Sequence, residues 1–314
     1  MREKGHRTCT LIHPRESPTD AEDAHLYFRK ADAYMDLQGK TAIITGSSAG
    51  VGRAIAVEYA RQGANVVCCA RREDRLRETV GLVEREGGHA LAVRADVTKK
   101  DEVENVARAA LERFGQIDVL YNNAATFMAI GALWEVDEDV WWQDMTNNVL
   151  GPMLCCRAVL PHMMGRNTGL IINMDGGGSS APFPGATGYG CSKAALMRLT
   201  DTLARELEHD GYNIYVVGMG PGSVYTEIWE PQLNTPGGKK WIGELRRIVD
   251  EKLYGQPEDC ARASVELIRV ICPEINGCVF GVETDFQEIA KRAKEIRERD
   301  LYQIRTKPDP IHSS

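Results

Sequence analysis

The sequence predicts an α/β fold in which helices cover both faces of a doubly wound parallel sheet of about seven strands. From Lys40 onward, short β-branched runs alternate with segments of helical length and period. Several runs are almost continuously apolar, which is typical of strands buried on both faces. A glycine-rich turn separates the first run from the first helical segment. The predicted strands are TAIIT (41–45), NVVCCA (65–70), ALAVRA (90–95), DVLY (118–121), LIINM (170–174), NIYVVGM (213–219) and CVFGV (278–282).

The chain divides into three segments. Residues 1–37 are polar and contain proline breakers, so we expect an N-terminal extension that is either disordered or docked on the folded body. Residues 38–284 form a single domain, because no repeat or low-complexity linker interrupts them. Residues 285–314 form a C-terminal helix and tail. The helix is predicted over 286–304, with an apolar stripe of Phe286, Ile289, Ala293 and Ile296 that packs on the body or on a second subunit.

Composition narrows the function classes. The hydrophobic share of 43% contains no apolar run near the ~18 residues of a membrane span. A net charge of -7 argues against a nucleic-acid partner. The nine cysteines show no C-x-x-C spacing and the histidines are scattered, so we expect neither a disulfide framework nor a metal site. These features predict a cytoplasmic protein.

The first predicted strand ends in TGSSAGVG, residues 45–52, and a helix is predicted directly after it, over 53–62. Glycines at this place let the backbone approach a pyrophosphate, whose charge is met by the amide groups of the helix N-terminus. The turn therefore predicts a dinucleotide site in a Rossmann-type sheet. Its predicted cofactor-binding residues are Gly46, Ser48, Gly50, Val51 and Gly52.

The end of the second strand bears on cofactor choice. A fold that selects NAD typically carries an acidic residue there, but this chain has Ala70 followed by Arg71 and Arg72, which could receive a 2′-phosphate. NADPH is thus favoured over NADH, although arginines that are ordinary surface charges would leave NADH open. Two further strand ends supply predicted cofactor contacts, Asp96 with Val97 after the third strand and Asn122, beside Asn123, at the fourth.

Tyr189 and Lys193 are spaced i, i+4 on a predicted helix, so both side chains lie on one face. Tyrosine is a poor acid–base group at neutral pH because its reference pKa is about 10. An adjacent ammonium, together with a cationic cofactor, would favour the phenolate. Beside a nucleotide turn, this pair indicates proton transfer coupled to hydride transfer.

Several motifs in this order give the chain a strong similarity to the classical short-chain dehydrogenases/reductases. The resemblance covers residues 38–284. The motifs are TGSSAGVG (45–52), Asp96-Val97, NNAA (122–125), NNVLG (147–151), YGCSK (189–193) and PGSVYT (221–226).

The resemblance implies roles by position. Tyr189 would be the acid–base, Lys193 would bind the nicotinamide ribose and tune the tyrosine, and Asn148 would anchor a proton-relay water. The segment contacting the nicotinamide amide would include Pro221, Gly222, Val224 and Thr226. A substrate lid is implied over residues 225–254. The resemblance also implies a homodimer or homotetramer assembled through helices over 150–164 and 190–209.

This chain departs from the family pattern at the serine that normally precedes the tyrosine by thirteen residues, where it has Gly176. Ser179 is the leading substitute, because the glycines at 176–178 would let the loop bulge, and Ser180 is a lesser version of the same idea. Alternatively Asp175, protonated or turned away, or the backbone amides would polarise the carbonyl. In a third reading no donor exists. The NMDGGGS segment resembles that of the chlorophyll b reductase subgroup.

The sequence thus predicts an NAD(P)H-dependent oxidoreductase that interconverts a carbonyl and a secondary alcohol. Apolar residues in the lid suggest an apolar, steroid-like small-molecule substrate, although they could instead pack the lid onto the body. They are Ile228, Trp229, Leu233, Trp241 and Ile242. The alternative, motivated by Gly176, is a regulator or scaffold that binds NADP(H) without turnover.

Overall fold

The computed structural model describes residues 35–305. The predicted N-terminal extension lies outside the described residues except for its end, where Leu37 is buried against the domain core.

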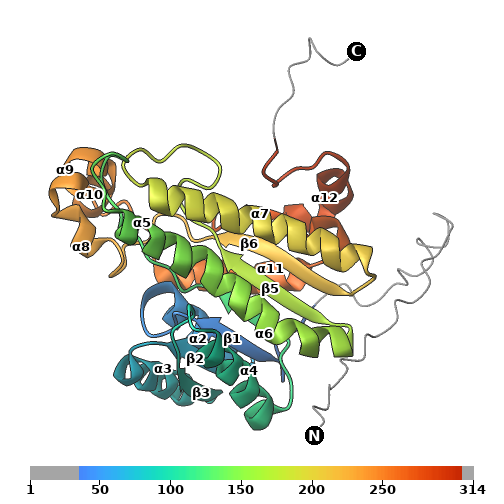
Figure 1. The fold of residues 1–314 in the computed structure, drawn as a ribbon. Helices are drawn as coiled ribbons and strands as arrows, with labels where there is room; N and C mark the ends of the chain where they lie inside the picture. Colours follow the sequence, from blue (N-terminus) through green and yellow to red (C-terminus); the bar gives the residue numbers. More distant parts are fainter. Residues whose placement is uncertain (1–34, 306–314) are drawn as a thin grey trace, which may run out of the picture. The chain divides into compact units, whose positions relative to one another are not determined.

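Seven parallel strands form one sheet in the order β3-β2-β1-β4-β5-β6-β7, which confirms the predicted fold class (Figure 1). The order reverses between β1 and β4, so the carboxyl ends of these strands border a crevice. Each predicted run forms a strand, with the largest loss at the last, which is shortened to three residues. The strands are β1 Thr41–Thr45, β2 Asn65–Ala70, β3 His89–Arg94, β4 Val119–Asn122, β5 Gly169–Met174, β6 Ile214–Gly220 and β7 Val279–Gly281.

Helices cover both faces of the sheet. On one face α2 (Gly50–Arg61), α3 (Glu73–Arg85), α11 (Pro257–Val270) and α12 (Phe286–Glu298) share one apolar core with the strands. On the other face α4 (Lys100–Phe114), α6 (Gly151–Arg166) and α7 (Thr187–His209) close a second core. None of the helices within residues 35–305 is long and apolar enough to cross a membrane.

Shorter elements lie around the crevice. α5 (Glu138–Met145) runs through a π-helical turn (Thr146–Leu150) into α6. α8 (Glu230–Leu233), α9 (Pro236–Trp241) and α10 (Gly243–Asp250) gather beyond one end of the sheet (Figure 1). A 3-10 turn (Pro273–Ile275) precedes β7.

The C-terminal helix is shorter than predicted. Asp285 caps α12 by accepting a hydrogen bond from the Glu288 amide at 3.0 Å, and the helix ends at Glu298 rather than at residue 304. Asp300 and Tyr302 then adopt positive φ angles of 50° and 58°, which no helix can continue. The chain therefore turns back, and the Val279 amide of β7 donates to the Tyr302 carbonyl at 2.8 Å. The predicted apolar stripe of α12 is buried against the body.

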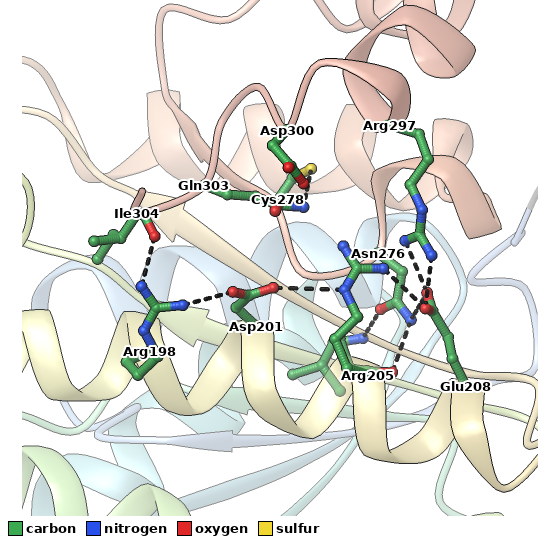
Figure 2. Close-up of polar contacts among 12 residues, drawn as sticks. Arg198, Asp201, Arg205, Glu208, Asn276, Cys278, Arg297, Asp300, Gln303 and Ile304 are labelled. Atoms are coloured by element: carbon green, nitrogen blue, oxygen red, sulfur yellow. Dashed lines mark hydrogen bonds and ion pairs between the residues drawn. The ribbon is translucent and has the colours of Figure 1, made fainter. Parts of the chain in front are cut away.

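Ion pairs fasten this C-terminal segment to α7 (Figure 2). Asp201, which is 6% exposed, pairs with Arg198 at 2.8 Å and with Arg305 at 2.6 Å. Arg198 also donates to the Ile304 carbonyl at 2.5 Å. About two turns further along α7, Glu208 pairs with Arg297 of α12 at 2.9 Å. The segment 299–305 is thus held beside β7 by both charge and backbone contacts.

Candidate active site

A cavity of about 1030 Å³ opens at the carboxyl ends of the strands. The turn after β1, the ends of the other strands, the start of α7, the segment after β6 and the C-terminal segment all contribute to its wall. This is the crevice that ligands occupy in open parallel sheets.

The turn after β1 has the shape that a pyrophosphate needs. Gly46 and Gly50 adopt positive φ angles of 67° and 52°. A Cβ on Gly46 would lie 2.8 Å from the Ala124 Cα, and a Cβ on Gly52 would overlap the side chain of Asn123. Gly46 and Gly50 line the cavity, whereas Gly52 lies behind them and packs the turn against Asn123. Because only glycine fits at these positions, the turn fits the phosphates of a dinucleotide at the start of α2.

Of the other residues predicted at the nucleotide end, Ser48, Val51, Arg71, Asp96 and Val97 line the cavity. The Asp96 carboxylate accepts hydrogen bonds from the amide and hydroxyl of Thr98, at 2.9 and 2.8 Å. Arg72 also lines the cavity and approaches the Ser48 hydroxyl at 3.3 Å.

Asn122 does not reach the cavity, contrary to expectation. It is the last residue of β4, and its amide nitrogen donates to the Asn173 side chain of β5 at 2.9 Å, on the face of the sheet that α6 covers. The next residue, Asn123, lines the cavity and donates to the carbonyls of Thr45 and Gly46. Because successive strand residues point to opposite faces, a shift of one residue changes which asparagine meets the ligand.

Tyr189 and Lys193 lie in the first turns of α7, and both line the cavity. The ammonium of Lys193 is 5.6 Å from the centre of the Tyr189 ring and donates to the Met174 carbonyl at 2.7 Å. The Tyr189 ring packs edge-on against Phe127, with centroids 4.9 Å apart. The spacing that predicted a shared helix face is thus matched by a shared cavity wall.

Without a bound cofactor, burial is the main influence on the pKa values of Tyr189 and Lys193. Desolvation raises the pKa of Tyr189, and the nearby carboxylates of Asp175 and Asp144 raise it further. Desolvation also lowers the pKa of Lys193 to about 8, an effect that Asp175 opposes. Burial therefore outweighs the expected influence of the lysine on the phenol, and the phenol is protonated at neutral pH. A positive charge brought by an oxidised nicotinamide would shift it toward the phenolate.

The place of the missing serine is filled by the tyrosine itself. A Cβ on Gly176 would overlap the Tyr189 hydroxyl oxygen and lie 2.9 Å from the ring carbon that carries it. Ser179 lines the same cavity, and its hydroxyl donates to the Asp175 carboxylate at 3.0 Å. Desolvation raises the pKa of Asp175, against hydrogen bonds from the Gly176 amide and Ser179. Its second oxygen, Oδ1, is buried without a hydrogen-bond partner in the described chain.

Asn148 lies in the π-helical turn and is 1% exposed. Its amide nitrogen donates to the Thr126 carbonyl and the Ser192 hydroxyl, both at 2.9 Å, and its oxygen accepts from the Thr126 amide at 2.8 Å. The side chain does not line the cavity and instead ties the loop after β4 to α7, one turn from Tyr189.

The predicted lid residues divide into two groups. Ile228 and Trp229 line the cavity, as do the predicted contacts Pro221, Gly222, Val224 and Thr226. Leu233 and Ile242 are buried in a small core with Phe127, and Trp241 packs against Gly185.

Sequence reasoning missed several cavity residues. Phe127 and Phe183 line the cavity beside Tyr189, and residues 302–305 line it from the C-terminal segment. The described residues contain no group of three or more His, Cys, Asp or Glu side chains that could hold a metal ion.

Comparisons with known proteins agree with this geometry. The short chain dehydrogenase family matches residues 40–236. A short chain dehydrogenase of Pseudocercospora fijiensis is 37% identical over 267 residues, covering 82% of this chain and 85% of that protein. The 3beta-hydroxysteroid dehydrogenase 1 of Eggerthella lenta is 36% identical over 252 residues, covering 80% and 94%. The solved structure of an NAD+-bound xylitol dehydrogenase has a TM-score of 0.69 at 25% identity, covering 79% of this chain and 98% of that one.

The family match covers more than half of the chain and includes the phosphate turn, Tyr189 and Lys193. The protein therefore belongs to the short-chain dehydrogenases/reductases, oxidoreductases that use NAD(P)(H).

Proposed function

We propose that this protein interconverts a carbonyl and a secondary alcohol, with NADPH preferred over NADH and Tyr189 as the acid–base. The supporting observation is that Tyr189 and Lys193 share one cavity with the glycine turn after β1. Arg71 and Arg72 at the nucleotide end of that cavity support the preference for a 2′-phosphate.

When bound, the cofactor supplies the hydride that reduces the carbonyl carbon. The turn residues Gly46, Gly50 and Val51 would hold its phosphates, and Thr226 lies across the turn from Gly50. Tyr189 donates its phenolic proton to the carbonyl oxygen, and the ammonium of Lys193 stabilises the phenolate that remains. A proton from solvent then restores the phenol. Asn148 is a positioning residue that fixes α7 against the loop after β4.

Ser179 serves as the second donor to the substrate oxygen. In the protein alone its hydroxyl donates to Asp175, a carboxyl whose pKa is raised by burial. A protonated Asp175 donates to the Ser179 oxygen, which frees the serine hydroxyl to donate to the substrate. The repulsion that an ionised Asp175 would exert on a developing alkoxide is then absent.

The substrate is apolar and of steroid-like size. Aromatic and aliphatic side chains line the cavity beside the Tyr189 hydroxyl, with few charges among them. They are Phe127, Phe183, Ile228, Trp229 and Leu245. The similarity to a 3beta-hydroxysteroid dehydrogenase supports this substrate class.

The proposal is tested with Tyr189→Phe in an assay of NADPH and NADH oxidation over ketones, aldehydes and oxosteroids. Loss of the general acid lowers kcat by about 10³-fold, while the Kd for cofactor stays within about twofold because the ring is retained. Unchanged turnover in Tyr189→Phe would refute the assigned role. Tight cofactor binding by the wild type without turnover on any substrate would identify the non-catalytic alternative instead.

A further inference from the structure

Glu227 reaches from the segment after β6 to the nucleotide end of the cavity. Its carboxylate pairs with Arg72 at 2.7 Å and lies 3.8 Å from Arg75 of α3. Both Glu227 and Arg72 line the cavity. Arg72 stands two residues after the end of β2, where the sequence has Ala70 in place of an acid.

The position of Thr226 shows how the segment after β6 reaches the nucleotide end of the cavity. The Thr226 methyl carbon lies 3.1 Å from the position of a Cβ on Gly50, so the segment crosses the phosphate turn. Glu227 thus extends beyond the phosphates toward the adenosine end. It brings a carboxylate from a different element to the arginine that would receive a 2′-phosphate.

We propose that Glu227 is a specificity-determining residue for the cofactor. Its carboxylate competes with the 2′-phosphate of NADP(H) for Arg72, because a phosphate and a carboxylate at one guanidinium repel each other. With NAD(H), the carboxylate keeps its arginine and accepts a hydrogen bond from a ribose hydroxyl, the role of the acid that Ala70 lacks. Glu227 therefore weakens the NADP preference that Arg71 and Arg72 alone would give.

The exposure of the Arg72 and Glu227 side chains limits the expected effect of Glu227 on cofactor affinity. The side chains of Arg72 and Glu227 are 52% and 51% exposed, so their pair is a surface ion pair. Such pairs contribute up to about 1 kcal/mol, which corresponds to about fivefold in affinity.

The test rests on the proposed cofactor and measures its binding, not turnover. Calorimetric Kd values for NADP+ and NAD+ are compared for the wild type, Glu227→Gln and the matched control Glu230→Gln. Glu230 is an exposed acid of the same segment for which the described residues provide no ion pair. We expect Glu227→Gln to move the ratio of the two Kd values about fivefold toward NADP+, and Glu230→Gln to leave it within about twofold.

Two results of this comparison would overturn the inference. One is an unchanged ratio in Glu227→Gln, and the other is an equal shift in Glu230→Gln, which would indicate a general effect of net charge. In an Arg72→Ala background the effect of Glu227→Gln on NADP+ should disappear, and its persistence would also contradict the competition. Cofactor binding without turnover would overturn only the proposed chemistry, whereas wild-type protein that binds neither cofactor would overturn the cofactor assignment and this inference with it.

Discussion

The Tyr189 hydroxyl occupies the space that a side chain at position 176 would need. A serine introduced at 176 must displace the tyrosine oxygen, so Gly176→Ser should lower kcat instead of restoring a family-like site. Ser179→Ala should lower kcat by about 10²-fold, as loss of one donor to a developing oxyanion does. Adding Gly176→Ser to Ser179→Ala should not recover the rate in steady-state assays.

The comparison variant is Ser180→Ala, which removes the alternative candidate donor of the same loop; Ser180 is exposed and also lines the cavity. An equal loss in Ser180→Ala, or a double variant faster than Ser179→Ala alone, would show that the donor lies elsewhere.

The buried ammonium of Lys193 makes the stability of the folded protein depend on pH. Burial lowers its pKa to about 8 in the folded protein, against about 10.4 in an unfolded chain. Below pH 8 folding bears the cost of a buried ammonium, about 3 kcal/mol, and this cost shrinks as the pH rises toward 10.4. Lys193→Met removes the cost but also the hydrogen bond to Met174, worth about 1 kcal/mol.

We therefore expect Lys193→Met to be inactive yet more stable than the wild type by about 2 kcal/mol at pH 7. The gain should decrease between pH 8 and 10 in urea unfolding. Lys294→Met, on an exposed position of α12, serves as the control. A gain that does not depend on pH would mean that packing, and not the ammonium, causes it.

At the scale of elements, α7 carries Tyr189 and Lys193 near its start and anchors the C-terminal segment along its length. Asp201 is buried among Arg198, Arg205 and Arg305. Asp201→Asn leaves these guanidinium groups without their shared anion, but they are 32–50% exposed and can be hydrated. We expect a loss of about 2 kcal/mol in stability.

The loss should be visible as a lower Tm and as faster amide exchange at Val279, whose N–H bonds to Tyr302. Glu206→Gln, an exposed acid of the same helix, should change neither. A Tm drop without faster exchange at Val279 would show that Asp201 stabilises α7 alone.

For the whole molecule, local sequence signals predicted the sheet well, because apolar runs of strand length need both faces covered. The glycine turn was predictable because few residues tolerate positive φ at Gly46 and Gly50. The features that the sequence did not predict depend on contacts between distant residues or on the direction of a single side chain. Asn122 and Asn123 are adjacent and of the same type, but only the Asn123 side chain faces the cavity. The end of α12 is set by contacts of residues 299–305 with β7 and α7. The Glu227–Arg72 contact joins positions 155 residues apart, which no local pattern reports.

The return of the chain beside β7 has a consequence for the solution behaviour of the protein. β7 is the last strand of the sheet, and an outer strand offers free backbone groups to a strand of another molecule. The Tyr302 carbonyl accepts a hydrogen bond from the Val279 N–H of this strand. Because Asp300 and Tyr302 have positive φ angles, the segment that covers β7 is too irregular to form a further strand of the sheet. The C-terminal segment thereby covers part of the β7 edge, and we expect it to hinder edge-to-edge pairing with another molecule, a role separate from its place in the cavity wall.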